Sequence, residues 1–319
     1  MDISYFLHPF QTLRNKYYAD LFRSEKFKQI VATDIKRALD LRFKASHGRK
    51  IDWDNPQTLD EKIMWLEGVT DTTEWSRLAD KYEVRKYIEE KIGEENLTEC
   101  YGVWDSVENI DYSSLPQKFV IKCTHDSGST YIVKDKSHTN LEELNANLKK
   151  HMKPIGTSTC EVHYQNIKPR IIAEELLEDE ENSKWSSSLI DYKIWCFNGK
   201  PFIGFICYDR FREPNGHISV TYDMFTLDPW EPKREYLSKK SANYKHIPRP
   251  DCLDEMLRIA KSLSEPFPQV RVDFYVIKGK PYFGELTFTS SNGINYFYSE
   301  LGQKVMGEAI DLSNVKRIR

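Results

Sequence analysis

The stretch from Val270 to Gly293 constrains this chain more than any other, because it has the pattern of a β-hairpin. Its first half has apolar residues at every second position, namely Val270, Val272, Phe274 and Val276. That period of two is typical of a strand. Residues 278–280 supply a turn, and residues 282–288 resume as a second strand. We therefore predict two antiparallel strands joined by a short loop.

Two carboxylates stand on this hairpin, Asp273 on the first strand and Glu285 on the second. Loop length decides whether they face each other, because a slip of one residue moves a strand's side chains to the other face. A two-residue loop would place them on opposite faces, and a loop with an odd number of residues on the same face. Because a three-residue loop with a left-handed glycine is common, we expect the two carboxylates to be neighbours, about 5–8 Å apart at Cβ. Arg271 and Thr287 would then share their face.

Such a pair of carboxylates implies a compensating partner. Two close carboxylates on a largely apolar hairpin repel each other unless a cation or a shared proton compensates them. Hard oxygen ligands without a nearby His or Cys pair suit Mg²⁺, which usually takes one or two carboxylates together with nucleotide phosphates. The alternative is a solvated polar face on an edge hairpin, since charged side chains prefer water.

Composition excludes several classes of protein. The 319 residues are enough for two or three modest domains with cores of their own. The 46 Lys and Arg nearly balance the 49 Asp and Glu, so no broad basic field indicates a nucleic-acid partner. With 18 Tyr and 16 Phe, the chain is too aromatic to be disordered.

Cysteine usage and the N-terminal residues bear on location. The six cysteines are scattered without a CxxC pair, which favours free buried thiols in a reducing compartment. The N-terminus lacks a basic segment followed by an apolar run, so we expect no signal peptide. No apolar stretch is long enough to span a bilayer. We expect a soluble, cytoplasmic protein, and a peripheral contact with a membrane stays open.

The first 92 residues are predicted to be helical. Residues 1–50 are basic and carry apolar residues at helical spacings, which fits either a helix that docks on an anionic membrane or partner or a helix packed on its own domain. Thr58 to Glu61 form a capping box that opens a helix through Glu67. Residues 73–92 are predicted to form a further helix.

A lysine before a loop of small residues marks the middle of the chain. Lys122 ends a predicted strand and is followed by the loop at residues 124–129, with the sequence THDSGS. Main-chain N–H groups of such a loop can cradle phosphate oxygens, and the lysine can neutralise them. An ordinary turn is the alternative, since neither a Walker A motif nor a Rossmann glycine pattern is present. His125 in this loop could be a base or a phosphate contact, although a lone histidine in a polar loop is more often simply exposed to solvent.

Further elements follow this loop. Thr139 to Glu142 form a second capping box, with a helix to about residue 150, and Asp251 is predicted to cap a helix through Leu263. Residues 171–177 are apolar and then abruptly acidic, as in a strand that leaves a sheet with free main-chain groups. An adenine edge needs such groups, although an edge strand with a surface loop has the same pattern.

Two further short patterns in the sequence predict turns. Asn198-Gly199 is a strong signal for a hairpin between residues 191–197 and 201–208. Asp52-Trp53-Asp54 could hold a metal in a nucleotide-sugar transferase. Its position before Asn55-Pro56 favours a turn instead.

In chain order, these pieces resemble the ATP-grasp superfamily, and they are most similar to the TupA-like ATP-grasp proteins of bacterial surface-polysaccharide synthesis. The likeness covers roughly residues 45 to 293. Its most specific parts are NPQTLDEK at 55–62 with Trp65-Leu66, DKYEVR at 80–85, and VRVDFY with GKPYFGELTF in the hairpin. The surrounding family is often labelled glycosyltransferase.

The resemblance implies a role for individual residues. Lys81 and Lys122 match lysines that hold ATP phosphates, and Ser127, Gly128 and Ser129 belong to the flexible loop that closes over them. The matches to the adenine hinge are Glu174, Glu175, Leu176 and Leu177. Asp191 stands where a ribose-binding acid is expected, and Lys193 is assigned to the same cofactor site.

The hairpin supplies the remaining roles that the resemblance implies. Asp273 and Glu285 match Mg²⁺ ligands, and Arg271 matches the arginine that steadies the acyl-phosphate. Many of these ligases have Asn two residues after the second carboxylate, where this chain has Thr287. The third ligand is therefore Thr287, Asn292 or water.

The resemblance also implies a fold and a reaction. The fold is α+β, with a helical N-terminal region at 1–115, a small α+β lid subdomain at 116–177, and a larger C-terminal domain with an antiparallel sheet at 178–319. The reaction is ATP- and Mg²⁺-dependent ligation of a carboxylate to an amine through an acyl-phosphate. The substrate would be an acidic sugar or a polymer that bears one, with acceptor contacts from residues 208–250. A glycosyltransferase, a sugar kinase and a non-catalytic ATP-binding protein remain alternatives.

Overall fold

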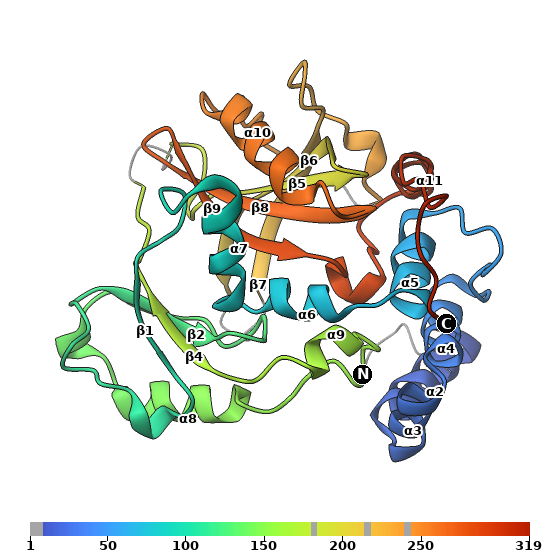
Figure 1. Cartoon of the computed structure of the whole chain (residues 1–319), viewed down its shortest axis with the longest axis horizontal. Coiled ribbons are helices and arrows are strands. Elements are labelled where there is room, and N and C mark those ends of the chain that lie inside the picture. The colour runs from blue at the N-terminus through green and yellow to red at the C-terminus, as the bar shows by residue number, and fades with distance from the viewer. Residues whose placement is uncertain (1–8, 180–183, 214–217, 239–243) are drawn as a thin grey trace.

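The computed structural model describes residues 9–179, 184–213, 218–238 and 244–319, with side chains from residue 13 onward. Its strands form two antiparallel sheets (Figure 1). The smaller sheet has the order β1-β4-β2-β3, with β1 Cys100–Trp104, β2 Phe119–Cys123, β3 Tyr131–Val133 and β4 Ile171–Glu174. The larger sheet has the order β7-β6-β5-β8-β9, with β5 Asp191–Phe197, β6 Lys200–Arg212, β7 Ile218–Phe225, β8 Gln269–Ile277 and β9 Lys280–Thr287. Helices and antiparallel sheets together confirm the predicted α+β class.

The helices gather at the N-terminal end and against the sheets. Before the first strand they are α2 Pro9–Arg23, α3 Glu25–Thr33, α4 Ile35–His47, α5 Leu59–Val69, α6 Thr73–Ala79 and α7 Glu83–Ile92. After it they are α8 Leu141–His151, α9 Val162–Gln165, α10 Leu253–Ser264 and α11 Glu300–Glu308. Short 3-10 turns are η1 Val107–Asn109, η2 Lys136–His138, η4 Arg234–Tyr236 and η5 Ser290–Gly293.

Alternation along the strands gives the larger sheet two different faces. One face is apolar throughout and packs on α10, α6 and α7; it includes Tyr192, Ile194, Val270, Val272 and Phe274. The opposite face is apolar only at one end, where Trp195, Phe197 and Phe205 pack against α5 and α11. Its other end carries charged side chains, because Asp191 and Lys193 precede Trp195 on β5. That polar end is the candidate site.

The smaller sheet likewise has one apolar face and one face with charged side chains. Phe119, Ile121, Ile171 and Ala173 are buried against α8 and its surroundings. The alternate positions on β2 and β4 place Lys122 and Glu174 on the opposite face. Figure 1 shows α8 on the outer side of this sheet, which leaves the lysine-bearing face directed away from α8.

Strand β1 belongs to the smaller sheet although it precedes residue 116. It pairs with β4 from Trp104↔Ile171 to Cys100↔Glu174. We therefore propose that the lid subdomain begins near residue 100.

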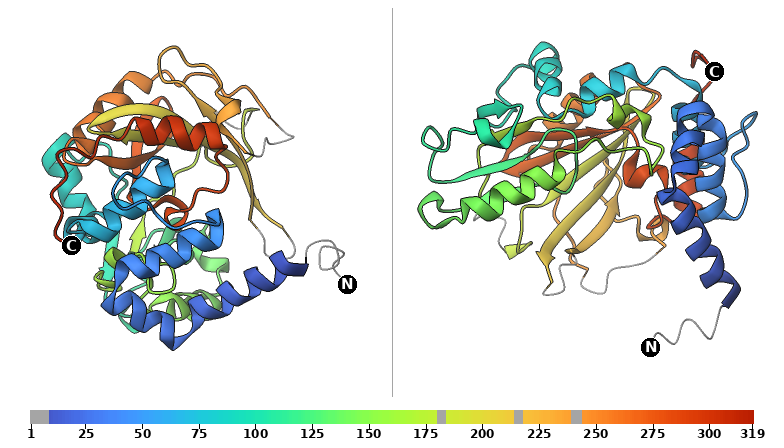
Figure 2. Two further views of the ribbon diagram at one scale, coloured as in Figure 1. Left: turned by 90° about the vertical axis from the view of Figure 1, so that its right-hand side faces the viewer. Right: turned by 90° about the horizontal axis from the view of Figure 1, so that it is seen from below.

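The N-terminal helices form a bundle of their own at one end of the molecule (Figure 2). Phe27, Leu39 and Phe43 are fully buried there, together with Met64 of α5 and Cys160 before α9. The bundle therefore rests on both the body and the segment that leads back to the lid sheet. This packing corresponds to the self-packed alternative for the apolar stripe of residues 22–39.

The predicted helix at 73–92 is wrong in one respect, because it is two helices with a break at Asp80. The Asp80 carboxylate accepts hydrogen bonds from the main-chain N–H groups of Tyr82, at 2.8 Å, and Glu83, at 3.2 Å. An aspartate that bonds the following amides competes with a continuous helix and starts a new one. Lys81 consequently lies in the break rather than on a helix face.

The predicted helix starts are partly confirmed. Thr58 caps α5 by accepting from the Glu61 N–H, and α5 runs to Val69. For α8 the cap is Asn140 rather than Thr139, since the Asn140 side chain accepts from Glu142 and Glu143. Helix α10 begins at Leu253 without a side-chain cap, so the prediction that Asp251 caps it is wrong.

The cysteines and the membrane expectation can be compared with the structure. All six cysteines are free, and all except Cys100 are buried, as predicted. Within the described ranges, no helix is long and apolar enough to cross a membrane. Residues 1–8, where no signal peptide was expected, lie outside the described residues.

Candidate active site

The hairpin of β8 and β9 brings Asp273 and Glu285 directly opposite each other, but not by the predicted loop. The loop has two residues, Lys278 and Gly279, with φ angles of 50° and 74°. Such a loop alone would have put the carboxylates on opposite faces. A β-bulge restores the pairing, because the register runs Phe274↔Phe283 and then Asp273↔Glu285. The expected three-residue loop is wrong, and the expected shared face is confirmed.

Gly284 is the extra residue of this bulge. A Cβ atom at Gly284 would lie 3.1 Å from the main-chain oxygen of Asp273, which is a tight approach. Glycine therefore allows the two strands to close over the bulge.

Arg271 is the centre of the site, since its guanidinium binds four neighbours. Nε donates to Asp273 Oδ1 at 2.7 Å and Nη2 to Oδ2 at 2.8 Å, a bidentate pair. Nη1 donates to Ser290 Oγ at 2.8 Å, and Nη2 also approaches Thr287 Oγ1 at 3.1 Å and Glu285 Oε1 at 3.4 Å. One buried arginine thus holds both strands of the hairpin and the start of η5.

Lys193 adds a second cation from β5. It stands opposite Asp273 in the sheet, and its Nζ donates to Asp273 Oδ2. Burial alone would raise the pKa of Asp273, but Arg271 and Lys193 outweigh burial, so this pKa is lowered. Burial likewise opposes the charge of Lys193, yet Asp273 and Asp191 raise its pKa overall. Asp273, Lys193 and Arg271 are therefore all charged at neutral pH.

Asp191 continues this row of charges toward β6. Its Oδ2 accepts from Arg210 Nη2 at 2.5 Å and lies 3.9 Å from Lys193 Nζ. Tyr275 is half-buried beside Asp191, and desolvation together with this carboxylate raises the pKa of its phenol. The residue predicted to bind ribose is thus held by an arginine, and Arg210, an expected acceptor contact, belongs to this row.

Glu285 differs from Asp273 in exposure and in its contacts. Its side chain is 45% exposed, whereas that of Asp273 is 4% exposed. Thr287 Oγ1 donates to Glu285 Oε1 at 3.2 Å, and among the described residues Oε2 has no hydrogen-bond partner. Thr287 therefore orients the carboxylate, which leaves one oxygen directed to solvent or a ligand. Asn292, the other suggested ligand, is exposed in η5 with φ 58°.

Lys122 of β2 is paired with Glu174 of β4 in the smaller sheet. Lys122 Nζ lies 2.5 Å from Glu174 Oε2, and Arg85 Nη1 lies 3.1 Å from Glu174 Oε1. Burial would raise the pKa of Glu174, but Lys122 and Arg85 lower it overall. Glu174, predicted for the hinge, is therefore a charged anchor between two cations.

Lys81 connects the helical segment to the loop at residues 124–130. Its main-chain N–H donates to Thr124 O at 3.0 Å, and its Nζ donates to Asp126 O. Burial lowers the pKa of Lys81, and among the charges that act on it are Glu285, which raises this pKa, and Lys122, which lowers it. Lys81 thus lies within electrostatic range of both the hairpin and the other lysine.

The loop that follows Lys122 is only partly available to a ligand. Ser127 and Gly128 are exposed at its tip, whereas Ser129 is buried. Ser129 Oγ accepts from the Cys123 N–H at 2.7 Å and donates to Asp126. His125 is also buried, and its Nε2 lies 2.9 Å from Lys153 O, so the expectation that it is solvent-exposed is wrong.

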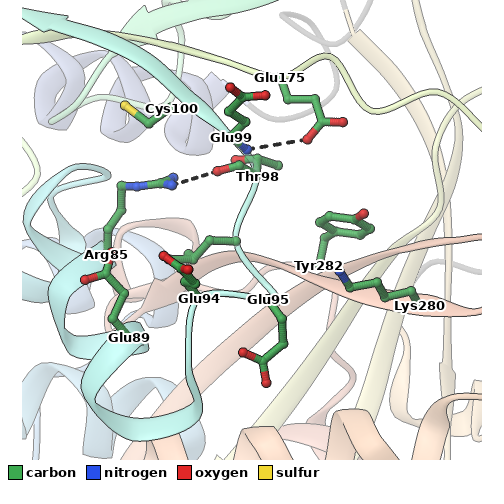
Figure 3. Close-up of a pocket in the computed structure, with 11 residues that line it drawn as sticks. Arg85, Glu89, Glu94, Glu95, Thr98, Glu99, Cys100, Glu175, Lys280 and Tyr282 are labelled. Carbon is green, nitrogen blue, oxygen red and sulfur yellow. Dashed lines mark hydrogen bonds between the residues drawn. The ribbon is translucent and has the colours of Figure 1, made fainter.

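The hinge leaves the smaller sheet at Glu174. The Glu175 N–H donates to Glu99 O at 2.9 Å, and the main-chain groups of Leu176 and Leu177 form no hydrogen bond within the described part of the chain. A cavity of about 490 Å³ lies beside Glu175. Arg85, Thr98, Lys280 and Tyr282 are among the residues that line it (Figure 3). Five of its lining residues are glutamates, so its chemistry differs from that of the lysine-lined face.

Sequence reasoning missed three residues of the site. Arg85 lies in the first turn of α7, and its role was missed because its partner Glu174 is distant in the sequence. Ser290 was not recognised because its role depends on the turn after β9. Tyr275 was assigned only to a strand pattern, although it lies beside Asp191.

The sequence of this chain matches the model of a known protein family. The family model described as TupA-like ATPgrasp matches residues 61–311, which is most of the chain. The chain belongs to the TupA-like ATP-grasp family. This membership confirms the ATP-grasp α+β fold, and the matched range includes Lys81, Lys122 and the whole hairpin.

The chain also aligns with several solved structures, all of low sequence identity. D-alanine–D-alanine ligase from Bacillus anthracis aligns at 16% identity and a TM-score of 0.43, over 77% of this chain and 66% of that chain. The same enzyme complexed with ATP aligns at 13% identity and a TM-score of 0.39, over 82% of this chain and 74% of that chain. An L-amino acid ligase from Bacillus licheniformis aligns at 16% identity and a TM-score of 0.48, over 92% of this chain and 63% of that chain. The chain thus spans about two thirds of the length of these proteins. No curated protein matches it.

Proposed function

We propose that this chain is an ATP- and Mg²⁺-dependent ligase that joins a carboxylate to an amine. Membership of the TupA-like ATP-grasp family supports ATP as the cofactor. The observation that carries the proposal is the facing pair Asp273 and Glu285, bound to Arg271 and within electrostatic range of Lys81. The phosphates of a bound nucleotide would contact Lys81 and Arg271, and a divalent ion would contact the carboxylates of Asp273 and Glu285.

The donor set fits Mg²⁺ as part of a nucleotide complex. Within the described ranges, no group of three or more His, Cys, Asp or Glu could hold a metal by itself. Mg²⁺ does not need such a cage, since it is usually held by one or two carboxylates and by substrate phosphates. Asp273 and Glu285 would supply these carboxylates, and Glu285 Oε2 is the oxygen with no partner among the described residues.

The cations of the site would do most of the work on the phosphates. When bound, Mg·ATP supplies a transferable phosphoryl group, which converts a carboxylate into an acyl-phosphate that an amine can attack. Lys81 and Lys122 would bind phosphate oxygens, and Arg271 offers a planar fork suited to the charge that spreads over the reacting oxygens. The tip at Ser127 and Gly128 would close over them and exclude water from the labile product.

The substrate class rests on the family resemblance. We propose an acidic sugar or a polysaccharide precursor that carries a carboxylate, a separate amine, and a cytoplasmic role in surface-polysaccharide or capsule synthesis. Residues 208–250 remain the proposed acceptor region, although 214–217 and 239–243 lie outside the described residues. In that region Lys233 Nζ lies 3.8 Å from Glu235, and Arg212 also has a partner.

The glycosyltransferase alternative has less support from the structure. Asp52 Oδ1 accepts from the main-chain N–H groups of Asp54, at 3.1 Å, and Asn55, at 3.0 Å. These bonds use the first carboxylate of the DxD pattern in a turn. A sugar kinase would share the site, and labelled phosphate retained on the acceptor would identify it.

The proposal is tested by ADP release in the presence of ATP, Mg²⁺, uronic acids and amines. Glu285→Gln should lower the rate by at least about a hundredfold, because loss of an electrostatic ligand typically costs this much. Its melting temperature should change little, since Glu285 is half-exposed. Asp273→Asn should also abolish the rate, but it should destabilise the fold by about 3–5 kcal/mol, because two buried cations lose their partner.

Asp251→Asn is the matched control, since Asp251 is exposed outside the site. It should leave both the rate and the melting temperature unchanged. An unchanged rate in Glu285→Gln would refute the ligase proposal, and UDP-sugar turnover that depends on Asp52 and Asp54 would favour the glycosyltransferase.

A further inference from the structure

The N-terminal helices carry a charge opposite to that of the rest of the chain. Residues 9–50 contain eleven Lys and Arg against four Asp and Glu, a net charge of +7. The rest of the chain contains 35 Lys and Arg against 45 Asp and Glu, although the whole chain has a net charge of only −3. Such an asymmetry creates a local positive field even in a nearly neutral protein.

Many of these cations are free to meet an external anion. Arg14, Lys16, Arg23, Lys26, Arg37 and Lys44 are exposed, and none of them has an ion pair or side-chain hydrogen bond within the described part of the chain. Other cations of the bundle are used internally; for example, Arg49 pairs with Glu61 and Arg42 donates to Ser158 O. The free cations lie on all three helices.

Helix α2 adds an exposed apolar edge to this field. Leu13 and Tyr17 are 60% and 62% exposed. They lie one turn apart and so share a face of the helix. Another side of α2 is turned inward, where Phe22 packs on the bundle core with its ring centroid 4.9 Å from that of Phe27. Both views in Figure 2 show α2 extending outward from the bundle, beyond the body of the molecule.

We propose that α2 and the cations of α2–α4 dock the protein on an anionic lipid surface. A helix that lies in the membrane interface needs a shallow apolar edge and basic residues, which α2 offers in Leu13, Tyr17, Arg14 and Lys16. Lys and Arg also bind through their electrostatic attraction to anionic headgroups. The docking is peripheral, and it is independent of the ligase chemistry.

A second copy of the chain is a poorer occupant of this surface. A stable protein interface buries about 1,200–2,000 Å², and the exposed apolar edge described for α2 consists of only Leu13 and Tyr17. Two copies meeting through α2 would also bring two regions of net charge +7 together, and like charges repel. Charge complementarity therefore favours an anionic surface.

The test is co-sedimentation of the full chain with lipid vesicles. The protein should bind vesicles that contain phosphatidylglycerol and not vesicles of phosphatidylcholine alone, and high salt should release it. The charge reversal Arg14→Glu with Lys16→Glu should lower the bound-to-free ratio by about tenfold or more. Leu13→Ser with Tyr17→Ser should lower it as well, because the apolar edge is lost.

Matched controls separate docking from general effects of charge or polarity. Lys86→Glu with Lys304→Glu reverses two cations on α7 and α11 that are 76% and 70% exposed. Ile318→Ser removes an apolar side chain that is 51% exposed elsewhere. These variants should bind as the wild type does, and circular dichroism confirms that each variant is folded.

Three outcomes would overturn the proposal. One is equal binding to neutral and anionic vesicles, or none to either. Another is wild-type binding by both α2 variants. The third is a dimer in light scattering that Leu13→Ser with Tyr17→Ser dissolves, which would assign the edge to a second copy.

Discussion

At the residue scale, the site is a row of alternating charges across four strands. Its members run in space from Arg210 through Asp191, Lys193, Asp273 and Arg271 to Glu285. Buried charges are tolerated when each has a partner. The cations that neutralise Asp273 in this structure are also the groups that would meet a nucleotide, so a bound Mg²⁺ would compete with Arg271 and Lys193 for that carboxylate.

A second buried cluster, formed by Glu67 and His163, should make the stability of the protein depend on pH. Burial raises the pKa of Glu67 to about 8, against an ordinary value of 4.5. Its Oε1 lies 3.5 Å from His163 Nδ1, and burial lowers the pKa of His163 to about 4, so the imidazole is neutral at higher pH. Arg42 and Arg319 partly oppose the shift of Glu67, and Glu161 opposes that of His163.

The sign of this dependence follows from proton linkage. Above pH 4.5 the unfolded chain releases the Glu67 proton, whereas the folded chain keeps it until about pH 8. The Glu67 contribution to stability should therefore fall as pH rises through this window, whereas His163, whose pKa is lowered to about 4, contributes the opposite change below its ordinary pKa of 6.5. Glu67→Gln removes this term, so its stability relative to the wild type should rise by a few kcal/mol between pH 5 and 8, measured by urea unfolding. Parallel curves of unfolding free energy against pH for the wild type and Glu67→Gln would contradict this prediction. Glu255→Gln, on the exposed face of α10, is the control.

At the scale of elements, sequence patterns predicted the strands and most helices but not their irregularities. Period-two alternation identified β8 and β9, and Asn198-Gly199 identified the hairpin of β5 and β6. The bulge at Gly284 was not predictable from alternation, because a glycine in a strand has no side chain that shows which way it points. The break at Asp80 was missed because helical periodicity continues on both sides of it.

The bulge yields a prediction for Gly284. Gly284→Val should destabilise the protein by about 1–3 kcal/mol, because the added atoms press on the main chain of Asp273. It should also lower ADP release, since the register of Asp273 and Glu285 depends on the bulge. Gly204→Ala in β6 is the control, because a Cβ there meets its nearest neighbour at an ordinary 3.5 Å. Equal effects of the two substitutions on melting temperature and rate would show that the bulge is not needed.

At the scale of the whole molecule, the site depends on two sheets that face each other. The smaller sheet presents Lys122 and Glu174 on the side away from α8, and the larger sheet presents its charged end. Neither local patterns nor composition could predict this arrangement; the order of motifs along the chain, through its family resemblance, did. The same resemblance did not indicate Arg85 or Ser290, because their roles arise only from packing between distant segments.

The central claim is that the facing carboxylates Asp273 and Glu285 bind Mg·ATP together with Lys81 and Lys122. Its most direct test is a titration of ATP followed by thermal unfolding, with and without Mg²⁺, for the wild type and Glu285→Gln. The account predicts that saturating Mg·ATP raises the wild-type melting temperature by several degrees, as about 2.7 kcal/mol at a hundredfold excess over Kd would. It predicts a much smaller rise for Glu285→Gln or when Mg²⁺ is removed. An equal rise in all three conditions, or a rise with UDP-sugar and none with Mg·ATP, would contradict it.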